Sequence, residues 1–460
     1  MNNSSGQSTL QLIGPLVIVL IITFTLIFFM PRMTIKTTVA VAGGILLFII
    51  SFASTQAALY ILIFSMLLGP EIVVSTTAGA TLGRGVTLRI DDFILLIIGF
   101  SWLARMAIYK ELGFFLRTPL NRPIAAYIIV CLISTLLGAF WGRVSLKTGF
   151  FFVLKYFEYM MIYFMVVNHL HDKKQIHYFL WALLFTCVAV SFFGIAQIPG
   201  GGRVSAPFEG EVGEPNTFGG YLVFMMAITI GLLLTAKLWR NRLIYGGISA
   251  IAFIPFLFTQ SRASYLAFFP MLMVFVWLSE KRKLIMLFLL FIAAFLPLIA
   301  PQEVKDRVAY TFTQQSQRGQ IQVGDVSLDT STSARLRSWK HALGDAVKHP
   351  ILGFGITGYE FLDAQYPRVL VETGMVGMIA FLILTWAIFK QGIAVFAQTG
   401  DNSHRGLSMG FLAGFIGLLV HAIGTNTFII VRIMEPFWFI VGVVVMIPQL
   451  ESVAYVDESP

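Results

Sequence analysis

The sequence predicts an all-α, polytopic integral membrane protein of about 12 to 14 transmembrane helices, because helices that span hydrocarbon need roughly 20 apolar residues each. Hydrophobic residues make up 57% of the 460-residue chain, and its mean hydropathy is +0.82. Only 12% of the residues are charged, whereas a soluble globular chain has about 25%. Long apolar runs such as "LIGPLVIVLIITFTLIFFM" (residues 12–30) approach the length of one span.

The apolar runs give the expected helices in chain order. Residues 56–69 form a short run, and with the preceding run they could instead make one broken helix. The first run has no small-residue cleavage site behind it, so we interpret it as a retained span. No internal repeat is visible, which argues against a transporter built from inverted repeats. The expected spans are 12–30, 37–54, 56–69, 92–109, 123–141, 149–170, 177–196, 215–236, 243–260, 262–279, 284–300, 367–390, 405–424 and 429–448.

The distribution of Lys and Arg predicts the orientation of these spans. Four basic loops, "KELGFFLRTPLNR", "DKK", "KLWRNR" and "EKRK", alternate with less basic ones and are expected in the cytoplasm. The less basic loops are then extracytoplasmic, and Arg32 and Lys36 fit this pattern poorly. Arg203, Arg262 and the long segment 301–366 are therefore expected to share one face. The extracytoplasmic loops are 70–91, 142–148, 198–214, 259–262 and 301–366.

The long segment divides the chain into a helix bundle (1–300), a large extracytoplasmic loop (301–366) and C-terminal helices with a short tail (367–460). Loops of this length are uncommon, so it is expected to be functional or partly folded. Its stretch "TSTSARLRSWKHALGDAV" predicts an amphipathic helix capped by Ser331 or Ser333. The helix could lie along the membrane, cover a cleft, or pack on a small core of the loop. Its apolar positions are Leu336, Trp339, Leu343 and Val347.

Composition also argues against several classes of chemistry. Cys131 and Cys187 both fall inside apolar segments, which argues against disulfide or metal chemistry. None of the seven histidines has metal-ligand spacing with convergent acids, so we expect no catalytic metal and no cofactor. The net charge of +9 fits membrane anchoring and anionic ligands. No aromatic-basic module for nucleic acid is visible.

Two arginines are the first candidate site residues. Arg203 follows three glycines in "PGGGRVSAPFEGEVGEPNTFGGYL", where Asn216 begins the next span, and a plain solvated loop is the alternative. Arg262 stands in "TQSRASYLA" between two apolar runs. An arginine in mid-bilayer costs about 2.5–3.5 kcal/mol on insertion scales, so it is expected at a helix end or beside an anion. Its planar fork of donors suits phosphate oxygens, and snorkelling to headgroups is the alternative.

A third candidate group lies in "HPILGFGITGYEFLDAQYPRVLVETGMVG". Asp363 could act as a base, or it could merely cap a helix or lie in solvent, and Tyr366 follows it. Arg368 and Glu372 are four residues apart, so a structural ion pair is the favoured interpretation.

Charges within the spans form the last group. Lys155 with Glu158 and Arg432 with Glu435 are each three residues apart, so self-neutralising pairs are expected. His421 and Asn426 are predicted near the same face as the arginines, where hydrogen bonding at a helix end is equally plausible. Arginines gathered toward one outer pocket would suit an amphipathic anion such as a lipid-linked phosphate.

Taken together, these motifs resemble the O-antigen ligase and O-antigen polymerase (Wzy-type) superfamily. The matching pieces are Arg203 in "GRVSAPF", then "QSRASYLA", "SARLRSWKHALGDAVKHPILGFG" and "DAQYPRVLVETGMVG". The resemblance covers roughly residues 150 to 390. Each piece is weak alone, and their combination in this order is specific.

The resemblance implies a metal-independent glycosyltransferase of the bacterial inner membrane, with a GT-C-like fold and a site facing the periplasm or cell exterior. Its donor would be an undecaprenyl-diphosphate-linked glycan and its acceptor a glycan, with membrane lipids, a flippase and chain-length regulators as further partners. Arg203 and Arg262 would hold the diphosphate and stabilise the charge that develops as the sugar leaves. Substrate-binding candidates are Arg335, Arg337, Tyr366, Arg368, Glu372, Asn216, His421 and Arg432.

One departure from the family pattern bears on the reaction. Where ligases carry a histidine in "HN", this chain has Asp363 and Ala364. That favours polymerisation of O-antigen or another exopolysaccharide over ligation to lipid A–core, with Asp363 as candidate base for the acceptor hydroxyl or as a group that orients the acceptor sugar. The second departure, "SRAS" for "SRG", keeps the arginine. An O-antigen ligase, a lipid-oligosaccharide flippase or transporter, and a binding scaffold remain the alternatives.

Overall fold

The computed structural model describes residues 34–76, 85–109, 117–209, 213–299 and 330–457, together with a few residues between 302 and 327. The expected span 12–30 lies outside the described residues. The other expected spans each correspond to a helix, so the prediction of an all-α polytopic protein is confirmed. Among the described residues, nine helices are long and apolar enough to cross a membrane.

The first half of the chain alternates helices with short connections. Ser54 separates α2 from α3 by capping the first turn of α3, where its Oγ accepts a hydrogen bond from the Ala57 amide at 3.2 Å. The two apolar runs before residue 70 are therefore separate helices. The elements are α2 (Ile35–Ala53), α3 (Thr55–Leu68), the antiparallel strands β1 (Glu71–Thr76) and β2 (Gly85–Arg89), α4 (Ile90–Tyr109), α5 (Asn121–Phe140), α6 (Leu146–His169), α7 (Lys173–Gln197) and the 3₁₀ turn η2 (Ile198–Gly200).

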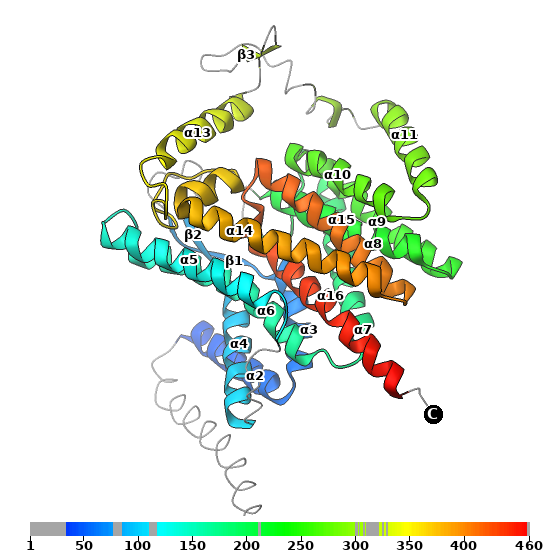
Figure 1. The fold of residues 1–460 in the computed structure, drawn as a ribbon, viewed down its shortest axis with the longest axis horizontal. Coiled ribbons are helices and arrows are strands. Elements are labelled where there is room, and N and C mark those ends of the chain that lie inside the picture. The colour runs from blue at the N-terminus through cyan, green and yellow to red at the C-terminus, as the bar shows by residue number, and fades with distance from the viewer. Residues whose placement is uncertain are drawn as a thin grey trace, which may run out of the picture.

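The second half supplies the inner helices of the bundle. In Figure 1, α13 lies beside the start of α14, and α8, α10 and α15 are neighbours. The elements are α8 (Pro215–Thr235), α9 (Trp239–Phe258), α10 (Arg262–Leu278), α11 (Arg282–Ile299), the paired strands β3 (Gln322–Val323) and β4 (Val326–Ser327), α13 (Thr330–Ala346), α14 (Gln365–Gln398), α15 (Asn402–Gly424), η3 (Thr427–Ile429) and α16 (Val431–Asp457).

Glycines let α8 and α15 approach closely. A Cβ added at Gly231 would lie 2.3 Å from the Gly406 carbonyl oxygen, and one at Gly410 would lie 2.6 Å from that of Ala227. Small residues allow such backbone contact between membrane helices, whose association depends on van der Waals packing because the hydrophobic effect does not drive it within lipid. The glycines of these apolar spans therefore serve packing.

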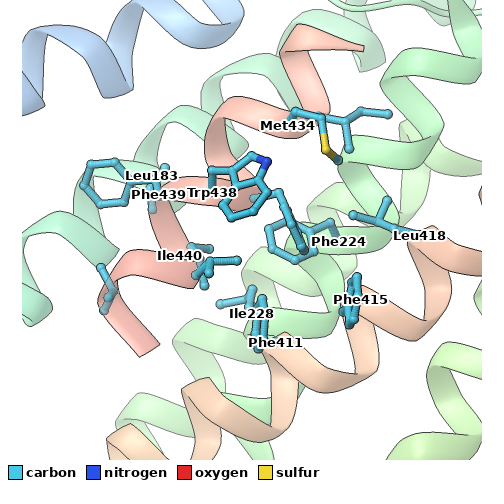
Figure 2. Close-up of a cluster of buried hydrophobic side chains, with 14 of the residues drawn as sticks. Leu183, Phe224, Ile228, Phe411, Phe415, Leu418, Met434, Trp438, Phe439 and Ile440 are labelled. Carbon is cyan, nitrogen blue, oxygen red and sulfur yellow. The ribbon is translucent and has the colours of Figure 1, made fainter. Parts of the chain in front are cut away.

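Aromatic rings fill the space between α8, α15 and α16 (Figure 2). Phe411 and Phe415 stack with centroids 6.1 Å apart, and the Phe415 ring lies 5.4 Å from that of Phe437. Phe224 of α8 lies 5.7 Å from Phe437. Offset aromatic contacts of this kind add stabilisation beyond the area they bury, so these three helices form a rigid centre for the bundle.

The amphipathic helix exists, with a different start and a different buried face from those predicted. α13 begins at Thr330, so Ser331 and Ser333 lie inside it and the predicted caps are wrong. Leu343 and Val347 are 50% and 76% exposed, whereas Ala342 is buried with Leu362 and Val371 in a small core. Small side chains thus hold α13 against the segment that begins α14.

Candidate functional site

Arg203 is tied to two neighbouring helices. Its Nε donates to the Thr259 carbonyl at 2.9 Å, and its Nη2 donates to Asn216 Oδ1 at 3.2 Å. The adjacent Val204 amide donates to the Phe258 carbonyl at 3.0 Å. These bonds fix the exposed Arg203 side chain between the α9–α10 turn and the start of α8.

Arg262 is the first residue of α10, which explains how a guanidinium occurs between two apolar runs. Ser261 caps the helix by accepting a hydrogen bond from the Ser264 amide at 3.3 Å. Arg262 Nη1 donates to Thr332 Oγ1 in the first turn of α13 at 3.3 Å. The charge therefore lies at a helix end beneath the long segment, and the sequence prediction of a helix-end location is confirmed.

Asp363 and Arg335 join α13 to the turn before α14. Arg335 Nη2 lies 2.9 Å from Asp363 Oδ2, and the two side chains are 27% and 25% exposed. Asn426 anchors the same turn by donating to the Leu362 carbonyl at 2.5 Å. The carboxylate is thus partly open to solvent and already oriented by a guanidinium.

His421 is a buried hydrogen-bonding centre below these groups. It is 0% exposed, its Nε2 lies 3.1 Å from Ser264 Oγ, and its Nδ1 lies 2.8 Å from Thr427 Oγ1. The ring also interacts with the backbone of Asn216. These contacts join α8, α10 and the end of α15, in agreement with the helix-end alternative given for this histidine.

We call the surface that carries Arg203, Arg262, Arg335 and Asp363 the site face. The contacts above connect all four residues: Arg203 reaches Asn216 and the α9–α10 turn, Arg262 begins α10, and Arg335 lies three residues after Thr332. Helices α8, α10 and α13 all begin at this face, so their amide groups add to its positive potential. The arrangement can bind an anion and orient a group that meets Asp363.

The predicted pair Arg368–Glu372 holds a turn. Arg368 Nε lies 3.1 Å from Glu372 Oε2, and the residues are only 8% and 4% exposed. Glu372 Oε1 accepts from the Thr357 amide at 3.1 Å, and its carbonyl accepts from Gly355 at 2.8 Å. A Cβ at Gly353 would come within 2.5 Å of the Glu372 backbone. The Gly-rich stretch therefore packs on α14, as the structural interpretation expects.

The charges inside the spans pair differently from the prediction. Lys155 lies 3.5 Å from Glu158, as expected, and it also contacts Asp92. Arg432 contacts Glu209 at 3.5 Å, while neither oxygen of Glu435 has a hydrogen-bond partner. The predicted pair Arg432–Glu435 is wrong, because long-range contacts to the loop after Arg203 replace the local pairing.

Other predicted residues lie around this framework. Tyr366 donates its hydroxyl proton to the Leu419 carbonyl at 2.6 Å, and Arg337 is exposed on α13. Substrate binding by both stays a prediction. Thr259 and Thr332 were not identified as site residues from the sequence. The only feature of the sequence that could have indicated them is that each lies within three residues of a candidate arginine. Among the described residues, no group of three or more His, Cys, Asp or Glu side chains could hold a metal ion.

The fold and the site define a multi-pass membrane protein with a cationic face at the ends of its helices. The family model described as O-antigen ligase (Wzy_C) matches residues 247–382. The matched segment, which covers less than half of the chain, is similar to the O-antigen ligase family, whose members are glycosyltransferase-like enzymes, and the predicted superfamily resemblance is confirmed. No curated protein matches the sequence.

The matched region includes part of the site face. It contains Arg262, Arg335 and Asp363 and extends into α14, whereas Arg203, Asn216 and His421 lie outside it. The hydrogen bonds of Arg203 to Thr259 and of His421 to Ser264 bring these outer residues to the matched segment.

Proposed function

We propose that this protein is a membrane glycosyltransferase that polymerises undecaprenyl-diphosphate-linked oligosaccharide repeat units at the outer face of the bacterial inner membrane. The observation that carries the proposal is the joining of Arg203 and Arg262 at the α9–α10 turn, within and beside the O-antigen ligase match. Two fixed guanidiniums suit the two phosphates of such a donor, because arginine offers bidentate donors to phosphate oxygens.

In the proposed reaction an acceptor hydroxyl oxygen attacks the anomeric carbon of the donor glycan. The new C–O glycosidic bond forms while the bond from that carbon to the phosphate oxygen breaks. Undecaprenyl diphosphate leaves with the electron pair, and Arg203 and Arg262 stabilise its charge. The hydroxyl proton passes to Asp363, whose carboxylate Arg335 orients at 2.9 Å. The enzyme thus contributes positioning, charge stabilisation and one proton acceptor.

An O-antigen ligase is the second candidate, because the matching family model carries that description. It would use the same donor and the same arginines and differ only in its acceptor, a lipid A–core or a protein. The presence of Asp363 where the family's ligases carry histidine favours polymerisation. A flippase or transporter would move the donor without forming a bond.

One assay separates these functions. Purified protein in lipid nanodiscs receives lipid-linked repeat units, alone or with a lipid A–core acceptor, and products are resolved by mass spectrometry. Long glycan on undecaprenyl diphosphate supports a polymerase, and glycan on the lipid core supports a ligase. In liposomes, translocation of unchanged donor with no new bond would identify a transporter and refute the proposal.

The same assay tests the site. Arg203→Ala and Arg262→Ala should each lower kcat about 10²–10³-fold, the range found when one preorganised donor to a developing anion is removed. Arg405→Ala is the matched control. Arg405 is paired with the exposed Glu280, and this pair lies beside the C-terminal end of α10 and the N-terminal end of α15, which are the ends remote from the site face. Unchanged elongation in both site variants would remove the arginines from the mechanism.

A further inference from the structure

Phe208 has an unusual backbone conformation for a large side chain. Among the described residues, three that are not glycine have positive φ: Phe208 on the loop after Arg203, Gln260 in the α9–α10 turn, and Thr357 in the loop before α14. Phe208 has φ +60° and is 54% exposed. Bulky residues rarely occupy this region, and such strain persists only where surrounding contacts enforce it, most often at functional sites.

A buried ion pair enforces this conformation. Arg432, 1% exposed, donates from Nη1 to the Pro207 carbonyl at 2.6 Å and from Nη2 to the Phe208 carbonyl at 3.2 Å. Glu209, 7% exposed, lies 3.5 Å from Arg432 and accepts hydrogen bonds from the amides of Ala206 and Glu214 at 3.2 and 2.9 Å. We call Arg432 and Glu209 the loop clasp.

The loop clasp is a costly way to hold a loop. Burying two charges removes them from water, and apolar side chains of similar volume often stabilise a fold as well or better. Here the clasp fixes three successive residues, 207 to 209, by their carbonyl and carboxylate groups. One of these residues is Phe208, whose backbone is strained and whose ring is 54% exposed. Because the clasp holds an aromatic ring at the surface, we infer that the exposed ring has a function.

Phe208 lies on the same loop as Arg203. Phe208 is five positions after Arg203, so their Cα atoms are at most about 18 Å apart even for a fully extended chain. Both ends of this short loop are fixed, one by the Thr259 and Asn216 bonds of Arg203 and the other by the clasp. A glycan whose phosphate end is at Arg203 can reach the Phe208 ring with its first few sugars.

We propose that Phe208 contacts a sugar ring of the glycan at the site face, and that the loop clasp positions it for this contact. The inference rests on the proposed function and deepens it. The negative face of an aromatic ring is attracted to C–H groups, and one face of a pyranose ring presents several C–H bonds. An aliphatic side chain of similar size offers the same apolar area without that electron-rich face.

The experiment compares Phe208→Leu, Phe208→Tyr and Phe208→Trp in the elongation assay with a defined oligosaccharide acceptor. All three keep a Cβ at the positive-φ position, so strain is matched across them. Phe208→Leu should raise the KM for the acceptor about three- to tenfold, the range that an aromatic contact contributes, with kcat changed less. Phe208→Tyr and Phe208→Trp should stay near the wild-type KM. Phe140→Leu is the control, because Phe140 at the end of α5 is 83% exposed.

The clasp is tested as a positioning device. Arg432→Lys should raise the acceptor KM as Phe208→Leu does, and the double variant should add little to either single change. A wild-type KM in Phe208→Leu would overturn the sugar contact. Phe208 would then be an apolar side chain that anchors the loop in the membrane. Equal loss in all three Phe208 variants would reduce the residue to a structural role. Failure of the wild type to form any glycosidic bond would overturn the proposed function, and this inference with it.

Discussion

The partly open ion pair between Asp363 and Arg335 allows a sharp test of the proposed base. Asp363→Asn keeps the shape of the side chain and can still accept a hydrogen bond from Arg335, but it cannot take up the acceptor's proton at neutral pH. Arg335→Lys keeps the positive charge and loses the planar fork that now orients the carboxylate at 2.9 Å.

The two possible roles of Asp363 differ greatly in magnitude. Side chains that are 25% and 27% exposed make an ion pair worth about 0.2–1 kcal/mol, which corresponds to a rate effect of only about 1.4- to 5-fold. A general base contributes about 10²–10⁴-fold. We predict that Asp363→Asn lowers kcat at least about 100-fold with little change in KM, because proton transfer occurs only in the transition state.

The assay is initial-rate elongation by purified protein across a range of pH. Glu360→Gln is the matched control, since Glu360 is an exposed carboxylate three residues earlier in the same loop. Asp363→Asn should be slower than the wild type at every pH tested, whereas Glu360→Gln should match the wild type. A fall in kcat below about 5-fold, equal to that of Arg335→Lys, would refute the base and leave a simple ion pair.

Two further predictions concern stability. Glu372→Gln leaves Arg368 as a buried charge without its carboxylate. Thermal unfolding in detergent should therefore show a free energy of unfolding lower by about 3–5 kcal/mol. Glu280→Gln, which breaks the exposed pair with Arg405, is the control, and an equally small loss in both variants would contradict the prediction. Hydrogen bonds from Lys348 and then Tyr359 hold the pKa of Asp345 below its ordinary value. Because the folded pKa is the lower one, this contribution is present above the unfolded pKa of about 4 and is lost as pH falls through the folded value. The protection of the α13 amides, meaning their exchange rate relative to that of an unfolded peptide at the same pH, should therefore fall below about pH 4 in the wild type, whereas Asp345→Asn should show lower protection at pH 7 and protection that changes little with pH.

Length and hydropathy sufficed to predict the described spanning helices. A run of about 20 apolar residues has few alternatives in a bilayer, because every backbone group must be paired within its own helix. The segment around α13 obeys weaker constraints. Leu343 and Val347 recur at helical spacing, yet both are exposed, whereas Ala342 packs in the small core and Ala346 is also buried. Close approach to Leu362 and Val371 favours small side chains, and periodicity of large apolar residues cannot indicate that.

The candidate site was predictable as a set of residues on one face and unpredictable in its contacts. Alternation of loops predicted that Arg203 and Arg262 share a face, and both are found at the α9–α10 turn. The hydrogen bond from Arg262 to Thr332 spans 70 residues, and no local pattern encodes it. The same reason explains the error at Arg432, where a partner three residues away was expected and the carbonyls of residues 207 and 208 are bound instead.

The positions of the arginines along their helices support an anionic ligand on physical grounds. Cations stabilise the C-terminal end of a helix, and at the N-terminal end each is unfavourable by about 0.3–1 kcal/mol. Arg262 begins α10, and Arg335 lies in the second turn of α13. Phosphate is favoured both at helix N-termini and beside guanidiniums. We therefore expect the proposed diphosphate donor to offset the unfavourable position of these arginines when it binds.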